Sequence, residues 1–163
     1  MEAPNTLTVL FRHNLWANLR ILEACAALTG EQLDARMAGG FGSIRDTLQH
    51  IVTSEQSYFS RISTGQRLNR PDDAPALTAA ELVASARTTG SGLIEWAPRV
   101  RADDTVAIDW DGTPREVPKS IILTQAINHA TEHRAQIMAI LTQLGIEPPY
   151  LAGWEYFESL TEC

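Results

Sequence analysis

Apolar residues recur every three or four positions along four long segments of this sequence, and this spacing constrains the fold more than any other feature. In the first segment, residues 6–28, the stripe consists of Leu7, Leu10, Phe11, Ile21, Leu22, Cys25 and Leu28. Because an α-helix has about 3.6 residues per turn, residues spaced in this way share one face. The segment is expected to be an amphipathic helix that stops at Gly30.

Three further segments show the same period. The second is predicted over 43–63, between an N-cap serine and Gly65. The third, over 78–96, opens with the threonine-to-glutamate spacing of a capping box, although two glycines near its end weaken it. The fourth covers about 119–144 and ends before Gly145.

The stretch 104–117 changes to a period of two. Val106, Ile108 and Trp110 occupy alternate positions before Asp111-Gly112, which predicts a β-hairpin whose turn is made longer or irregular by Thr113-Pro114. A short helix around 154–160 is expected near the end of the chain. The predicted fold class is all-α: a four-helix bundle with a small hairpin before the last long helix and a short C-terminal helix, in one domain over 1–163.

Composition limits the classes of partner. The formal charge is −7 and the pI is about 5.0, which argues against nucleic acid, because phosphate binding needs a basic surface. No apolar run approaches the ~20 residues that cross a bilayer. Met1–Pro4 carry an acid where a secretory signal has basic residues, and Cys25 and Cys163 are too few for a disulfide framework. We expect a cytoplasmic protein with no membrane or nucleic-acid partner.

His129 and His133 lie four residues apart inside the fourth predicted helix. This spacing places two imidazoles on one face, one turn apart, where both can hold one metal ion. The alternatives are two buried histidines that are satisfied by hydrogen bonds, or a helix that turns both towards water. The pattern differs from the zincin motif, because no glutamate directly follows His129, and Glu132 lies off the histidine face.

His50 lies in the second predicted helix, about a third of a turn from the centre of the apolar stripe. Periodicity alone therefore favours a solvated or flanking position. Against this, Ser54 and Ser57 on the same face are small and would leave room for a ligand between helices. Asp46, one turn earlier, could accept a hydrogen bond from the imidazole.

Other polar residues have more ordinary interpretations. His13 is expected at the surface or at a pocket rim. Gln136 is expected to pack or hydrogen-bond between helices rather than to touch substrate, and Arg134 to form a structural ion pair rather than to bind an anionic substrate. Glu55 points away from His50 on the helical wheel, so no general base is assigned.

The chain resembles the DinB/YfiT superfamily of metalloenzymes over nearly its whole length. The segments that carry the resemblance are 13–18, 41–50, 128–136 and 141–145. The resemblance implies a divalent metal, often nickel or zinc, bound by one histidine of the second helix and two of the fourth, here His50, His129 and His133. It also implies an up-up-down-down bundle and a homodimer.

Three neutral imidazoles leave a divalent ion with its full charge and an open position. Such an ion lowers the pKa of a bound water, which permits hydrolysis, or that of a thiol, which permits thiol transfer. The superfamily includes thiol-dependent S-transferases and a mycothiol-dependent isomerase, so the resemblance favours transfer of a low-molecular-weight thiol to a small-molecule substrate. A bundle that binds metal or ligand without turnover and a metal-free interaction module are the alternatives. Zinc or nickel is expected, with iron, manganese and copper also compatible with histidine ligands.

Overall fold

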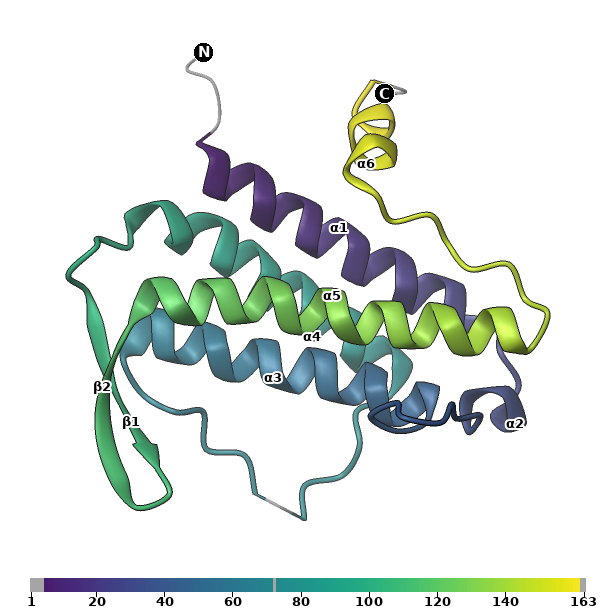
Figure 1. The fold of residues 1–163 in the computed structure, drawn as a ribbon, viewed down its shortest axis with the longest axis horizontal. Coiled ribbons are helices and arrows are strands. Elements are labelled where there is room, and N and C mark those ends of the chain that lie inside the picture. Colours follow the sequence, from purple (N-terminus) through teal and green to yellow (C-terminus); the bar gives the residue numbers. More distant parts are fainter. Residues whose placement is uncertain (1–4, 72, 162–163) are drawn as a thin grey trace.

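The computed structural model describes residues 5–71 and 73–161, and it is mostly helical within them (Figure 1). A two-stranded antiparallel sheet precedes the longest helix. In chain order the elements are α1 (Thr6–Ala26), α2 (Gly30–Leu33), α3 (Ile44–Thr64), α4 (Ala79–Trp96), the 3₁₀ turn η1 (Ala97–Arg99), β1 (Thr105–Trp110), β2 (Thr113–Pro118), α5 (Lys119–Gln143) and α6 (Gly153–Ser159).

Local capping chemistry sets the bounds of the long helices. Ser43 and Thr78 each accept a hydrogen bond from the backbone N–H three residues later, and each forms a complete capping box, with Asp46 and Glu81 respectively. Gly65 ends α3 with a positive φ of 74°, a conformation that glycine adopts without steric cost. The predicted start of α3 and its end near Gly65 are therefore confirmed.

The connection after α1 differs from its prediction. The helix ends at Ala26, and Gly30 is the first residue of α2 instead of a stop. Thr29 and Gln32 form a capping box that starts this extra turn, a signal that the apolar periodicity does not reveal because α2 buries none of its residues.

The two glycines of α4 do not interrupt the helix; they let it approach its neighbours. A Cβ atom at Gly90 would lie 2.6 Å from Leu15 Cδ1 on α1, and one at Gly92 would lie 2.3 Å from Phe59 Cζ on α3. A side chain at either position would fit only if Leu15 or Phe59 moved. Close packing against α1 and α3 therefore accounts for glycines that weaken the helix on propensity alone.

The hairpin is tighter than predicted. Trp110 pairs directly with Thr113, so only Asp111 and Gly112 form the turn, with positive φ values of 53° and 81°. Two positive φ values define the turn whose twist matches paired strands, which is why Asp-Gly suits it. Pro114, which was expected to lengthen or distort the turn, pairs with Asp109. Proline has no backbone N–H to donate, but a two-stranded sheet tolerates it because each strand has a free edge.

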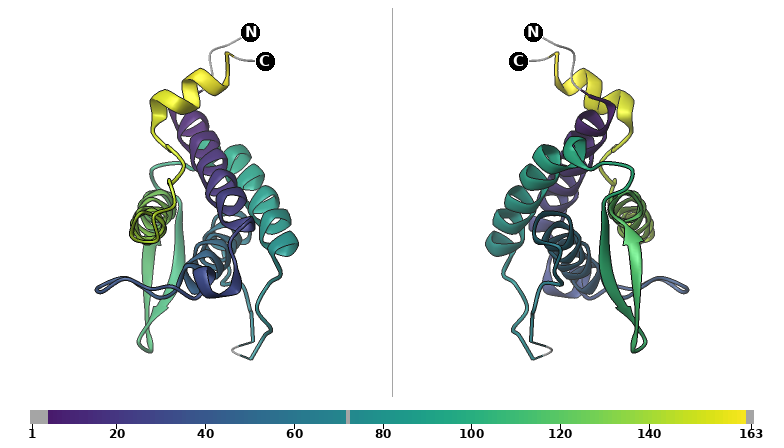
Figure 2. Two further views of the ribbon diagram at one scale, coloured as in Figure 1. Left: turned by 90° about the vertical axis from the view of Figure 1, so that its right-hand side faces the viewer. Right: turned by 90° about the vertical axis from the view of Figure 1, so that its left-hand side faces the viewer.

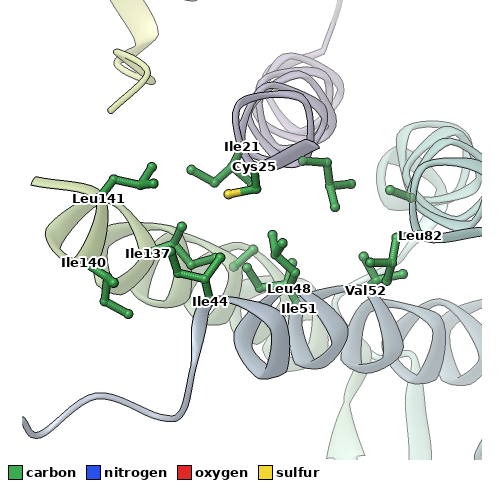
Figure 3. Close-up of a cluster of buried hydrophobic side chains, with 13 residues drawn as sticks. Ile21, Cys25, Ile44, Leu48, Ile51, Val52, Leu82, Ile137, Ile140 and Leu141 are labelled. Atoms are coloured by element: carbon green, nitrogen blue, oxygen red, sulfur yellow. The ribbon is translucent and has the colours of Figure 1, made fainter. Parts of the chain in front are cut away.

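The four long helices contact one another in the cyclic order α1, α4, α3, α5. Figure 2 looks nearly along α3 and α5 and shows α1 and α4 inclined to them. One hydrophobic cluster fills the end where α1 finishes and α3 begins (Figure 3). Its largest buried members include Ile21, Ile44, Ile137, Ile140 and Leu141.

A second cluster at the opposite end fixes the helix directions. It joins Phe11 near the start of α1 to Ile62 at the end of α3, Leu93 at the end of α4 and Ile122 at the start of α5. Helices α1 and α5 therefore run one way, and α3 and α4 run the other. The expected up-up-down-down order is wrong, and the observed order is up-down-down-up. The physical reason is that the segment between α3 and α4, described over 65–71 and 73–78, leads back along the molecule. Helix α4 therefore starts at the end where α3 started (Figure 1).

Two sequence-based expectations concern residues outside the described ranges. Met1–Pro4, which bear on a secretion signal, and Cys163 both lie there. Cys25 is buried in the first cluster as predicted, and burial raises the pKa of its thiol to about 12. Over residues 5–71 and 73–161, no helix combines the length and the apolar character that crossing a bilayer would require.

Candidate metal centre

Three histidines from two helices converge between α3 and α5. His50 lies on α3, and His129 and His133 lie one turn apart on α5. Each contributes one ring nitrogen to a group whose members all lie within 4.8 Å of one another. The Nε2 atoms of His50 and His129 are 2.9 Å apart, close enough for one ring to donate to the other. The structure thus brings together all three predicted residues, and this group could hold a metal ion.

The position of His50 shows why its own helix did not predict it. The apolar stripe of α3 faces the core between the helices, and His50 lies beside that stripe, half-buried, where α5 covers the flank. A helical wheel describes one helix and contains no information about which neighbour covers its flank. His133 is buried, and His129 is intermediate.

Gln136 fixes the orientation of His133. Its Oε1 atom accepts a hydrogen bond from the backbone N–H of Phe41 at 3.3 Å and lies 3.0 Å from Nδ1 of His133. Because this oxygen can only accept, Nδ1 of His133 must carry the proton, which leaves Nε2 with a free lone pair. From the sequence, Gln136 is predicted to pack or hydrogen-bond between helices. The structure adds a contact with His133, which a spacing of three residues on one helix makes possible.

Phe41 covers the centre from the segment that precedes α3. Its ring stacks on His50 with centroids 4.0 Å apart and planes 17° apart, and it meets His133 edge-on at 5.1 Å. Phe41 as a whole is 51% exposed. A stacked aromatic ring excludes water from one side of the imidazoles, so an incoming molecule must reach them from another side.

The comparisons with known proteins agree on one family. The family model described as "DinB family" matches residues 1–161. The chain belongs to the DinB family. Among solved structures, a DinB-like protein from Bacillus cereus ATCC 10987 is 23% identical with a TM-score of 0.60, and the match covers 86% of this chain and 91% of that one. A DinB-like protein from Bacillus subtilis is 15% identical with a TM-score of 0.63, covering 90% and 98%. The search of curated proteins found none that matches this chain.

Burial favours the neutral form of two imidazoles in this DinB-family chain, those of His50 and His129. Burial, reinforced by the neighbouring rings of His133 and His50, lowers the pKa of His129 from its ordinary 6.5 to about 4. Burial and His133 also lower the pKa of His50. A metal binds only the unprotonated nitrogen, so these shifts leave the group ready for a cation at neutral pH.

The chemistry of this donor set fits a divalent metal. Neutral imidazole nitrogens are donors that zinc, nickel, copper and iron all accept. Nitrogens bound to a tetrahedral zinc at about 2.1 Å lie about 3.4 Å apart. The Nε2 atoms of His50 and His129, which are 2.9 Å apart, would therefore separate slightly around such an ion. Within residues 5–71 and 73–161, no carboxylate or thiol joins the three histidines in this group.

Asp46 does not support His50, contrary to expectation. Its Oδ2 atom accepts hydrogen bonds from the backbone N–H of Ser43 at 3.1 Å and from Arg36 at 2.8 Å. The capping box engages this carboxylate at the start of α3, so it is turned away from the imidazole one turn later. These contacts lower the pKa of Asp46.

A buried polar network beside the centre was missed by the sequence analysis. Glu55 accepts hydrogen bonds from the side-chain amides of Asn14 and Asn18, both at 3.0 Å, and from the hydroxyl of Thr89 at 2.9 Å. Arg134 donates to the oxygens of the same two asparagines at 2.9 and 2.6 Å. The network therefore joins α1, α3, α4 and α5. Two asparagines four residues apart on the core face of α1 were the available signal.

The two charged ends of this network are both about 3% exposed. Burial raises the pKa of Glu55, against the hydrogen bonds and the Arg134 charge that lower it. Burial lowers the pKa of Arg134 to about 10. Arg134 is thus a structural cation, as expected, although asparagines link it to Glu55 in place of a direct ion pair.

His13 lies at a separate place. Its Nε2 atom is 2.9 Å from the carbonyl oxygen of Leu151, and its ring contacts Trp16 and Tyr156. It lines a cavity of about 720 Å³ between α5 and the segment before α6, in agreement with the predicted pocket rim.

Proposed function

We propose that this protein is a metal-dependent enzyme that acts on small molecules, with His50, His129 and His133 as the ligands of one divalent cation. Zinc and nickel are the first candidates, with iron, manganese and copper as alternatives. The observation that carries the proposal is the convergence of three ring nitrogens from two helices, all within 4.8 Å of one another. Histidine side chains from separate helices rarely meet in a core without a partner that satisfies them.

The proposed reaction is transfer of a low-molecular-weight thiol to an electrophilic small molecule. A bound divalent cation would supply Lewis acidity, which lowers the pKa of a thiol or water beside it. The surroundings favour a thiol, because no acidic residue of the described chain belongs to the histidine group and Glu55 is fully engaged by its amide and hydroxyl donors. A thiol, whose pKa is about 8.5, needs less help to ionise than water, whose pKa is several units higher.

The chain's own residues would hold and shield the site. Gln136 keeps Nδ1 of His133 protonated and its Nε2 available, and Phe41 excludes water on the side where it stacks on His50. Low water access strengthens every electrostatic interaction inside the site. These roles are compatible with either thiol transfer or hydrolysis, and hydrolysis is the alternative reaction.

The test uses protein purified without a histidine tag and loaded with zinc or nickel. It is incubated with monochlorobimane and, separately, with glutathione, bacillithiol or mycothiol, and conjugation is followed by fluorescence. We expect metal-dependent conjugation with at least one thiol, lost in His133→Ala. Metal binding without conjugation of any thiol would contradict the transferase assignment and favour hydrolysis or a non-catalytic metal-binding role. Absence of bound metal would contradict the ligand assignment itself.

We further propose that the four long helices form one DinB-type bundle domain in the reducing cytoplasm and that the protein is a homodimer. Exposed apolar side chains on α6 support the homodimer, because Trp154 and Phe157 are 78% and 61% exposed on a short helix. Light scattering of the eluted protein would give twice the chain mass for a dimer, and Trp154→Glu should reduce it. A monomer at all concentrations would contradict this part of the proposal.

A further inference from the structure

A cavity of about 380 Å³ lies under the hairpin, between β1, β2, α3 and α5. This volume is within the range of small-molecule sites. Figure 1 shows the hairpin beside the start of α5 and the end of α3. Neither the fold nor the histidine group requires a cavity there, since the core of that end is already closed by the second hydrophobic cluster.

The cavity adjoins the histidine group through Tyr58. This side chain lines the cavity and also meets the ring of His129 edge-on, with centroids 5.7 Å apart. On α5 the cavity-lining Gln125 and Ile121 precede His129 by one and two turns on the same side, which corresponds to about 6 and 12 Å along the axis. A molecule of about 10 Å could therefore fill the cavity and reach the three imidazoles past Tyr58.

The outer wall of the cavity is apolar and is left open by the fold. Ile108 and Trp110 of β1 line it opposite Ile121 of α5. Trp110 and Ile121 are 52% and 56% exposed, which is unusual for large apolar side chains that face each other across one hollow. Burying this surface against an apolar ligand would stabilise the bound state.

Among the described residues that line this cavity, Arg61 is the one that carries a charge. The guanidinium of Arg115 lies outside the lining, 5.5 Å from the centroid of the Trp110 ring. The guanidinium of Arg61 donates to the backbone carbonyl of Ser57, at 3.3 Å, and to the Ser57 hydroxyl. In the described ranges no carboxylate lies within 4.0 Å of it, whereas Arg20, Arg36 and Arg45 all have such partners. No acidic side chain lines the cavity among those residues. A guanidinium with unused donors in a half-buried apolar site is a receptor for an organic anion.

We propose that this cavity binds the substrate of the metal centre, and that the substrate is a small organic carboxylate with an apolar body. The carboxylate lies on Arg61, the body packs against Ile108 and Trp110, and the reacting end extends past Tyr58 towards His129. The substrate role rests on the proposed function, whereas the binding of an apolar carboxylate by the cavity does not.

Calorimetric titration of the full chain with two matched probes tests the inference: 4-phenylbutyrate and the neutral 4-phenyl-1-butanol. Hydrogen bonds to charged groups contribute enough for us to expect about tenfold or tighter binding of the carboxylate. Arg61→Gln should remove this preference, and Arg61→Lys, which keeps the charge, should retain part of it. Arg67→Gln is the matched control, because Arg67 is an exposed neighbour outside the cavity and its replacement should leave the preference intact.

The same titrations on the His133→Ala protein separate the two proposals. If metal is lost and the carboxylate still binds, the cavity stands whatever the metal centre does. The inference about the cavity is overturned if the wild type retains metal but binds the two probes equally. It is also overturned if Arg61→Gln binds both probes as the wild type does. In both cases the proposed function survives. Loss of the carboxylate preference in Arg67→Gln would also overturn the inference about the cavity, since a general surface charge would then explain the binding.

Discussion

The side-chain oxygen of Gln136 contacts both Nδ1 of His133 and the backbone N–H of Phe41, whose ring covers the histidine group. Replacing Gln136 with leucine removes the acceptor for Nδ1 of His133 and frees the ring to take the other tautomer. We expect Gln136→Leu to weaken metal affinity by roughly 10–100-fold, the usual effect of losing such a partner. Competition with a fluorescent zinc chelator would measure it.

Two variants make this prediction specific. Gln136→Glu keeps the acceptor oxygen and should retain most of the affinity. Gln143→Leu makes the same replacement at an exposed position of the same helix and should change nothing. Equal affinity of Gln136→Leu and the wild type would show that the contact does not orient His133.

The lowered pKa of His129 predicts how the free energy of unfolding of the metal-free chain depends on pH. This pKa is lowered from 6.5 to about 4 in the folded chain, so between these values the unfolded chain binds more protons than the folded one. The stabilising contribution of the neutral ring is complete above pH 6.5 and is lost as the pH falls towards 4. Denaturant titrations of the wild type and His129→Asn, subtracted at each pH, isolate this contribution from that of Glu55.

The expected outcome is that the wild type becomes less stable relative to His129→Asn as the pH falls through this window. If the stability of the wild type relative to His129→Asn does not change with pH, or rises as the pH falls, the prediction is contradicted. Either result would mean that folding does not disfavour the protonated ring of His129.

At the scale of the elements, Gly92 lets α4 approach α3. Alanine is a better helix former by about 1 kcal/mol, but its Cβ would lie 2.3 Å from Phe59 Cζ. Overpacking of this kind costs about 1–3 kcal/mol, so we expect Gly92→Ala to lower the free energy of unfolding by up to about 2 kcal/mol. Gly30→Ala is the control, because no atom lies within 4 Å of the added Cβ. An increase in stability for Gly92→Ala would contradict the packing argument.

The network of Glu55 and Arg134 holds the four long helices together at their centre. Arg134→Met leaves the side-chain oxygens of Asn14 and Asn18 without their donor and removes the cation that offsets Glu55. Loss of one member of a buried charge pair typically costs roughly 3–5 kcal/mol, and denaturant unfolding would measure it. Arg20→Met, which breaks an exposed pair with Glu23, should cost less than about 1 kcal/mol. Similar costs for both variants would refute a structural role for the network.

The elements that could be predicted are those specified by neighbouring residues. The capping boxes at Ser43 and Thr78 and the left-handed Gly65 are local, and so the bounds of α3 and the start of α4 followed from the sequence. The helix directions did not follow from the sequence, because they depend on where the connection between α3 and α4 leads, and no local signal specifies that. For the same reason, the pairing of His129 and His133 on one face of α5 could be predicted from their spacing in the sequence. The third ligand, His50, was predicted only from the family resemblance, because the periodicity of its own helix favoured a flanking position.

At the scale of the whole molecule, the histidine group links α3 to α5, two helices that run in opposite directions and belong to distant parts of the sequence. A cation held there would restrain these two helices against each other, while the hairpin and Phe41 limit the routes by which a molecule can reach it. The aromatic ring of Phe41 thus lies against the metal ligands, and Tyr58 joins them to the adjacent cavity. The central claim is that His50, His129 and His133 together bind one divalent ion.

X-ray absorption spectroscopy of the tag-free, zinc-loaded protein tests that claim most directly, because it counts the imidazoles around the metal. We predict one zinc per chain, surrounded by three imidazole nitrogens and at least one ligand that is not histidine, with one imidazole fewer in any His50→Ala protein that still retains zinc. A zinc content well below one per chain, or a spectrum unchanged by His50→Ala, would contradict the account.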